Sequence, residues 1–215
     1  MRIIARFAKG DAAKFTSHLD LQRLFIRAFS RAKLKVAFSQ GFNPHPKLSF
    51  ATALSLGMTS SAEWLDIKFE TNIRPLEFID KLNENLPDGI RIISAFIADD
   101  SMKALTALTL SADYEVDIPG FGEDALKNAA ETIMSGSIVV RKRGKAGVKD
   151  IDIRGQVHDL KVSGEKLLIC GELGTSGALN IELFMDKFFE ALGEHAGYSA
   201  KRTEINFSGG FLPAF

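Results

Sequence analysis

The stretch HLDLQRLFIRAFSRAK, residues 18–33, has the strongest pattern in this chain of 215 residues. Its apolar residues recur every three or four positions, which places them along one side of an α-helix. Ser17 precedes the stretch and Asp20 follows that serine by three positions, an arrangement similar to a capping box that starts a helix. We therefore predict a helix with one apolar stripe, formed by Leu21, Leu24, Phe25, Ala28, Phe29 and Ala32.

The segments on either side of this helix alternate between strand and helix patterns. The segment GFNPHPKLSF, residues 41–50, cannot be helical because a glycine and two prolines interrupt it. The predicted elements of the first half are a strand over 2–7, the helix over 18–33, strands over 35–38 and 63–70, a helix over 75–86 and a strand over 90–97.

The second half repeats this order with weaker signals. Asn180 is placed to cap a late helix and Gly193 to end it. The predicted elements are a strand over 112–118, a helix over 124–134, a hairpin over 138–141 and 148–153, a second hairpin over 157–162 and 166–170, a helix over 180–192 and a strand over 203–207.

Two successive β-α-β-β-α-β patterns predict an α+β chain of two tandem ferredoxin-like units, with antiparallel sheets and helices on one face. We place the N-terminal unit at residues 1–100 and the C-terminal unit at 108–215, because Asp99-Asp100-Ser101 interrupts the pattern between them. The alternative is one continuous α+β domain with a larger mixed sheet. The repeat concerns topology only, since the two halves share no convincing sequence repeat.

The amino-acid composition indicates the cellular compartment in which the protein is expected. The single cysteine, Cys170, forms no internal disulfide and cannot hold an iron–sulfur cluster by itself, and a reducing compartment suits it best. No apolar run reaches the roughly 18 residues of a membrane span. The chain opens directly with a strand-like segment. We therefore expect a cytoplasmic protein with no membrane association.

The charge of the chain is sorted along its length although the total is zero. The first 50 residues contain ten lysines and arginines against two aspartates, whereas residues 51–140 contain six basic and fifteen acidic residues. Sorted charge creates local fields even in a neutral protein. The zero net charge therefore does not exclude an anionic partner.

Three arginines give the predicted first helix a basic side. Arg23, Arg27 and Arg31 are four residues apart, so their side chains share one face opposite the apolar stripe. Guanidinium groups bind phosphates and carboxylates through paired hydrogen bonds. We predict an anion-binding face here. The alternative is a solvated helix face on which Arg23 pairs with Asp20.

Two histidines are candidates for chemistry. His18 lies in the first turn of the helix, where an anion could bind and where its ring could donate or accept a proton. His45 lies between two prolines, in a stiff loop that would present Asn43, His45 and Lys47 to a ligand with little loss of entropy. The alternatives are a histidine that orients a neighbouring loop and a turn whose prolines serve geometry alone. The spacing of the histidines matches no compact metal motif, so we predict no metal and no cofactor.

A second basic segment lies in the second half. RKRGKAGVK, residues 141–149, contains five basic residues and no acid, with glycines at its expected tip. Such a finger is suited to gripping phosphates, and its binding would weaken with salt. The alternative is a solvated hairpin tip. The residues that we expect to bind phosphate are Arg141, Lys142, Arg143 and Lys145.

Four segments in the first 70 residues resemble a known family. FTSHLDLQR (15–23), SQGFNPHPKLSF (39–50), LSLG (54–57) and AEWLDIKFE (62–70) follow, in order and spacing, the pattern of the radical SAM-linked domain family, whose function is unknown. The later VVRKRGKAGVKDIDIR (139–154) is similar to a basic segment in such proteins. The resemblance covers roughly residues 2–207. It implies an accessory role beside a radical SAM protein encoded nearby, with RNA or a ribosomal component as substrate.

Three functions follow from these observations. The first is a substrate-binding module for a radical SAM enzyme, without catalytic activity of its own, that binds RNA or a ribonucleoprotein through its basic residues. The chain lacks the CxxxCxxC motif, so radical chemistry would belong to the partner. The second is a metal-independent RNA-processing enzyme that uses His18 and His45. The third is a protein–protein adaptor without RNA contact.

Overall fold

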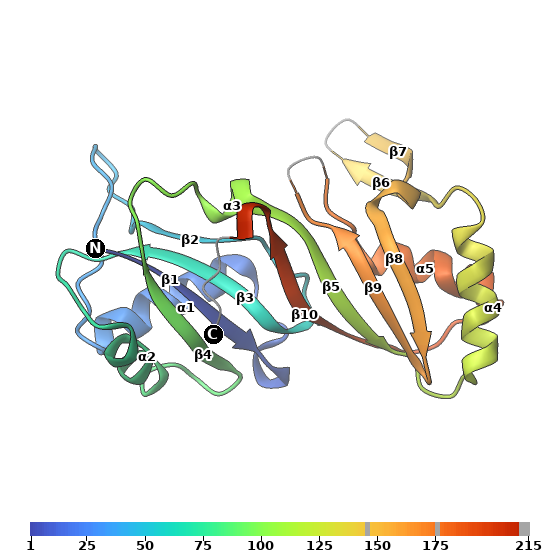
Figure 1. The fold of residues 1–215 in the computed structure, drawn as a ribbon, viewed down its shortest axis with the longest axis horizontal. Coiled ribbons are helices and arrows are strands. Elements are labelled where there is room, and N and C mark those ends of the chain that lie inside the picture. Colours follow the sequence, from blue (N-terminus) through green and yellow to red (C-terminus); the bar gives the residue numbers. More distant parts are fainter. Residues whose placement is uncertain (145–146, 175–176, 211–215) are drawn as a thin grey trace. The chain divides into compact units, whose positions relative to one another are not determined.

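The computed structural model describes residues 1–144, 147–174 and 177–210 (Figure 1). These residues form an α+β structure with mostly antiparallel strands and five α-helices, which confirms the predicted class. The chain divides into two compact units. Unit 1 comprises Met1–Thr109 and the end of the chain from Ser208, and unit 2 comprises Leu110–Phe207.

Unit 1 is built on a small antiparallel sheet. Its elements are β1 (Arg2–Lys9), α1 (His18–Arg31), β2 (Leu48–Phe50), β3 (Thr59–Lys68), α2 (Pro75–Asn83), β4 (Ile90–Ala98) and α3 (Leu105–Leu108). Strand β1 pairs with β3 on one side and with β4 on the other, and β2 pairs with β3. The order of the strands within this unit is therefore β4-β1-β3-β2.

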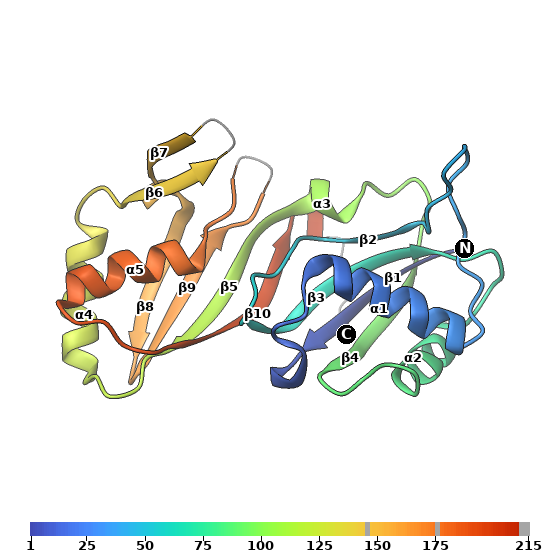
Figure 2. The ribbon, with the colours of Figure 1, turned by 180° about the vertical axis from the view of Figure 1, so that it is seen from behind.

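Helices α1 and α2 cover one face of this sheet (Figure 2). Phe25 of α1 meets Phe7 of β1 edge to face at 5.1 Å between ring centroids, and Phe78 of α2 lies in the same core. Full burial of a phenylalanine stabilises a fold by roughly 1.5–3 kcal/mol. Because successive side chains of a strand point to opposite faces, Ile3 and Phe7 face the helices whereas Arg2 faces away from them.

The predicted first helix is confirmed at its start and shorter at its end. Ser17 caps the helix, since its hydroxyl oxygen accepts a hydrogen bond from the backbone N–H of Asp20 at 3.2 Å. The helix ends at Arg31, two residues before the predicted end. Lys33 adopts a φ of 56°, a left-handed conformation that a right-handed helix cannot contain.

The strand predicted over residues 35–38 is wrong. Val36 and Phe38 make only isolated bridges, to Phe69 and Pro46, and the second strand of the unit is β2. The reason lies in the following loop, which folds back on itself. The backbone N–H of Ala37 still donates to the carbonyl oxygen of Lys68, but that of Ser39 donates to the carbonyl oxygen of His45 at 2.8 Å, so the pairing with the sheet ends after a few residues.

Unit 2 has a four-stranded sheet and a separate hairpin. Its elements are β5 (Thr109–Asp117), α4 (Glu123–Met134), β6 (Val139–Gly144), β7 (Gly147–Asp152), β8 (Val157–Ser163), β9 (Lys166–Glu172), α5 (Ile181–Leu192) and β10 (Ser199–Phe207). The sheet has the order β10-β5-β9-β8, while β6 and β7 pair only with each other among the described strands (Figure 1).

The helices of unit 2 bury a phenylalanine-rich face. Phe184 and Phe188 of α5 are fully buried. The predicted ends of α5 are confirmed. The side chain of Asn180 accepts a hydrogen bond from the backbone N–H of Leu183, and Gly193 ends the helix with a φ of 83°.

Candidate functional site

The β6–β7 hairpin is anchored at its base and exposed along its length. Ile138 and Val140 are buried at the base. The carboxylate of Asp152 accepts a hydrogen bond from the backbone N–H of Ile138 at 2.9 Å, and Ile153 donates its own N–H to the carbonyl oxygen of Ile138. Every residue of β7 is exposed. The hairpin therefore presents its outer residues to solvent from a fixed base.

Two lysines lie directly opposite each other on this hairpin. The strand register pairs Lys142 with Lys149, and both side chains are exposed. Opposite residues on neighbouring strands have Cβ atoms about 5 Å apart, and like charges at such positions destabilise the pair. In the described parts of the chain neither lysine makes a hydrogen bond or an ion pair. An anion bound between them would relieve their repulsion.

Arg141 is bound differently from these lysines. Its Nε donates to the carboxylate of Asp150, the residue opposite, at 3.2 Å. Because Arg141 and Lys142 are adjacent on one strand, their side chains point to opposite faces of the hairpin. One face thus carries a compensated ion pair and the other carries the two lysines. The predicted phosphate-binding side chains of Arg143 and Lys145 lie outside the described residues.

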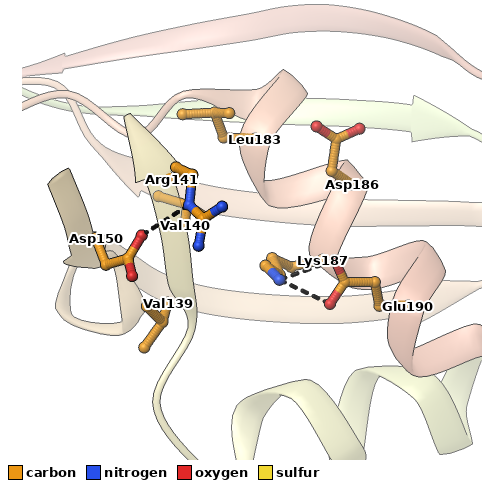
Figure 3. Close-up of a pocket in the computed structure, with 8 residues that line it drawn as sticks. All are labelled: Val139, Val140, Arg141, Asp150, Leu183, Asp186, Lys187 and Glu190. Carbon is orange, nitrogen blue, oxygen red and sulfur yellow. Dashed lines mark hydrogen bonds and ion pairs between the residues drawn. The ribbon is translucent and has the colours of Figure 1, made fainter. Parts of the chain in front are cut away.

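The face with Arg141 borders a pocket of about 520 Å³ between the hairpin and α5 (Figure 3). Lys187 and Glu190 form an ion pair across one turn of α5 at 2.7 Å. Acidic groups outnumber basic ones in this pocket, which makes it unsuited to an anion. The charged residues that line it are Arg141, Asp150, Asp186, Lys187 and Glu190.

The arginines of α1 are largely engaged by near neighbours. Arg23 pairs with Asp20 at 3.1 Å, as the alternative interpretation expected, and Arg31 donates to the backbone carbonyl of Asn85. The hydroxyl of Ser17, followed by Arg23 and Arg27, lowers the pKa of Asp20. Arg27 is exposed and, within the residues that the structure describes, makes no hydrogen bond or ion pair. Of the three predicted anion ligands, Arg23 is therefore paired with a carboxylate, Arg31 is held by a neutral carbonyl group, and Arg27 has neither kind of partner in the described residues.

The proline-stiffened loop contributes to a pocket in unit 1. His45 and Lys47 line a cavity of about 490 Å³ together with Ser49 and Lys68. Asn43 is exposed near the tip of the loop and is not among the lining residues of the described chain. The cavity lies on the face of the sheet that α1 and α2 leave uncovered, because Arg2 and Asp66 also line it.

The two candidate histidines lie on different faces of the unit 1 sheet. The His18 ring packs edge to face on Phe50, with 5.2 Å between centroids, and Phe50 belongs to the core beneath the helices. His45 lines the cavity on the opposite face. The structure therefore does not bring His18 and His45 together. In the described ranges no three histidine, cysteine, aspartate or glutamate side chains form a group that could hold a metal.

Cys170 shows no sign of activation as a nucleophile. Its side chain is half-buried in β9. Burial, followed by a hydrogen bond with Asp113, raises the pKa of the thiol. A raised pKa keeps the sulfur protonated and unreactive near neutral pH.

Three basic residues at these sites were not predicted from the sequence to bind anions. Lys149 lies in the basic run, yet only the register of the hairpin shows that it faces Lys142. Arg2 and Lys68 belong to strands that read as ordinary sheet, and they come together only through the pairing of β1 with β3. The alternation of side chains between the two faces of a strand shows which residues share a face. It does not show which strand lies alongside.

Comparisons with known proteins place the chain in a family without a known function. A family model described as "uncharacterized protein conserved in bacteria (DUF2344)" matches residues 2–183. A search of curated proteins gives no match. Among the described helices, none has both the length and the apolar character that a bilayer span requires.

Proposed function

Since the chain belongs to DUF2344, a family of uncharacterised bacterial proteins, we propose that it is an RNA-binding module whose β6–β7 hairpin holds phosphates. The observation that carries this proposal is the opposition of Lys142 and Lys149 on an exposed hairpin. Two neighbouring lysines without acidic partners in the described residues suit a ligand with several closely spaced negative charges, such as a nucleic acid backbone. Arg27 on α1 adds an exposed cation in the other unit.

A polyanion fits this hairpin better than a single small anion. The side chains of the two lysines are exposed, so a ligand would be held there by charge more than by shape. Contacts of this kind neutralise phosphates without reading bases. The proposed module therefore binds RNA with low sequence specificity and with strong dependence on salt.

The reaction itself is assigned to a partner enzyme. The resemblance of residues 15–70 to radical SAM-linked domains supports a radical SAM protein as that partner, and the single cysteine leaves this chain without a cluster of its own. The module would then present RNA, or a ribonucleoprotein, to the partner.

We also propose that both units are ferredoxin-like. The orders β4-β1-β3-β2 and β10-β5-β9-β8 support this, because each follows from a β-α-β-β-α-β chain when β6–β7 is treated as an insertion after α4. In this scheme the basic hairpin is an addition to a common fold. Such additions are frequent carriers of function.

Charge reversal on the hairpin tests the proposal. The double variant Lys142→Glu with Lys149→Glu should bind a single-stranded RNA at least roughly tenfold more weakly, since hydrogen bonds to charged groups contribute about 1.5–3 kcal/mol each. The slope of log affinity against log salt should fall by about 0.7 for each phosphate that the variant no longer neutralises. Fluorescence anisotropy at several salt concentrations measures both quantities.

The charge control is Lys161→Glu with Lys201→Glu, which changes the charge of unit 2 equally at exposed positions outside the hairpin, although Lys161 pairs with Asp159 at 2.7 Å. Equal loss of affinity in both double variants would show that only total charge matters and would refute the hairpin site. A wild-type protein without salt-sensitive RNA affinity would refute RNA binding altogether.

Two further experiments separate the alternatives. Co-purification with a radical SAM protein that survives nuclease treatment, in a chain that binds no RNA, would favour the adaptor. Cleavage of RNA by the wild-type chain but not by His18→Ala would favour the enzyme. The separation of the two histidine environments leads us to expect no such cleavage.

A further inference from the structure

Three cationic side chains form a row across three strands of unit 1. The register pairs Arg2 of β1 with Lys68 of β3. On the other side of β3, the backbone N–H of Lys68 donates to the carbonyl oxygen of Lys47 at 3.0 Å, next to the Leu48–Ile67 pair of β2 and β3. Residues in one row of a sheet point to the same face. Lys47, Lys68 and Arg2 are therefore neighbours on the face opposite α1 and α2.

Two members of this row are compensated. Arg2 is buried and bound to Asp66 through two hydrogen bonds, of 2.6 and 3.0 Å. Lys68 pairs with Asp100 at 2.6 Å. Lys47 is exposed, and in the described part of unit 1 its side chain has no hydrogen bond or ion pair. The row thus ends in one cation that lacks a counter-charge, beside two cations that are already paired with carboxylates.

The walls of the cavity above this row are held in place. On one side, Ser39 and His45 close their loop through two hydrogen bonds, one between backbones and one from the N–H of His45 to the Ser39 hydroxyl oxygen at 2.9 Å. On the other side, the Arg2 guanidinium donates to the carbonyl oxygens of Asp99, Met102 and Lys103. Both walls are therefore positioned before any ligand binds, which lowers the entropic cost of binding.

The lining has two chemical parts. Lys47, His45 and Ser49 supply a cation and hydrogen-bonding groups. Pro46, Met102 and Ala104 supply an apolar part. The volume of about 490 Å³ lies in the usual range for small-molecule sites. A ligand that fits both parts has a compact negative charge attached to a flat, weakly polar body.

We propose that this cavity binds the terminal phosphate monoester of a nucleotide, with the phosphate at Lys47 and the base or sugar against Met102 and Pro46. The nucleotide can be free or can be the 5′ end of an RNA. The proposal does not depend on the hairpin, because all the lining residues belong to unit 1. A simple phosphate would leave the apolar part of the cavity uncovered, and a nucleoside would leave Lys47 unpaired.

Titration calorimetry on the full chain tests this site with defined probes. 5′-AMP should bind more tightly than adenosine and more tightly than inorganic phosphate. Lys47→Glu should weaken AMP binding by at least about tenfold, because it replaces an attractive charge at the phosphate position by a repulsive one. Lys47 is exposed, so this variant should keep its fold, which circular dichroism verifies.

Arg91→Glu is the matched control. Arg91 is an exposed cation whose side chain points to the same face of the sheet, but its partner is Ala8, at the far end of β1 from Arg2. This variant should bind AMP like the wild type. Equal weakening by Lys47→Glu and Arg91→Glu would overturn the site, and so would equal affinity for AMP and adenosine or a lack of AMP binding.

Further arms separate this site from the hairpin and identify the source of the phosphate. Lys142→Glu with Lys149→Glu should leave AMP binding unchanged, so failure at one site is visible independently of the other. If RNA ends are the ligand, a 5′-phosphorylated oligonucleotide should lose affinity when its 5′ phosphate is removed, and Lys47→Glu should abolish that difference. A free nucleotide as ligand predicts AMP binding without this end effect.

Discussion

The arginine side of α1 and the lysine side of the β6–β7 hairpin look alike in sequence but differ in structure. On α1, Arg23 is held by Asp20 and Arg31 by the Asn85 carbonyl. On the hairpin, Lys142 and Lys149 face each other without an acidic neighbour in the described residues. The number of basic residues therefore does not measure the capacity to bind anions. What matters is whether the fold already supplies each cation with a partner.

The buried pair in unit 1 is the extreme case of a compensated cation and should show the largest effect on stability. Arg2→Ala should lower the free energy of unfolding by about 3–5 kcal/mol, because it leaves the Asp66 carboxylate buried without its counter-charge. Chemical denaturation measures this. Lys47→Ala, in the same row, should change stability by less than about 0.5 kcal/mol. A similar loss in the free energy of unfolding in both variants would contradict the division into cations that stabilise the fold and cations that bind a ligand.

Reversal of the α1 arginines should have a much smaller effect on RNA binding than reversal of the hairpin lysines. Arg23→Glu with Arg31→Glu should weaken RNA affinity less than about threefold, because these side chains already have partners, whereas the hairpin variant should lose at least about tenfold. Anisotropy titrations under identical salt conditions compare the two. A larger loss from the α1 variant would move the binding face from unit 2 to unit 1.

The cap of α1 should have a moderate effect on stability and none on RNA binding. Ser17→Ala removes the hydroxyl that accepts the Asp20 N–H and should cost about 1 kcal/mol in the free energy of unfolding. Ser30→Ala, an exposed serine of the last turn, is the control and should be nearly neutral. Thermal unfolding of both variants measures the difference, and equal melting temperatures would contradict the role of the cap.

The smallest expected effect concerns the acid dependence of α1. Ser17 first, and then Arg23, lower the pKa of Asp20 in the folded chain. A depressed folded pKa adds stability above the unfolded pKa, and this stability is lost as the pH falls through the folded value. NMR titration should therefore show the pKa of Asp20 rising more in Ser17→Ala than in Arg23→Ala. The reverse order would assign the shift to the arginine.

Several local features followed from neighbouring residues alone. The helix start at Ser17, the cap at Asn180 and the helix end at Gly193 each depend on hydrogen bonds or dihedral angles within a few positions. The prediction of a strand over 35–38 failed for a related reason. The two prolines of the following loop were recognised, but the return of that loop onto Ser39 requires a pairing that local propensity does not contain.

The candidate sites were predicted only in part. The basic run at 141–149 and the stiff loop with His45 and Lys47 were visible as sequence, because composition and proline content act locally. The partners were not visible. Asp66 lies 64 residues from Arg2 and Asp100 lies 32 residues from Lys68, so no local sequence pattern predicts either ion pair.

The sequence by itself determined the α+β class, most of the helices and strands, and the location of the basic segments, since periodicity and charge are properties of short stretches. Tertiary structure alone decided which cations are neutralised and which stay open to a ligand. Strand register is the physical reason. It sets Lys142 against Lys149, aligns Lys47 with Lys68 and Arg2, and separates His18 from His45 by the thickness of a sheet.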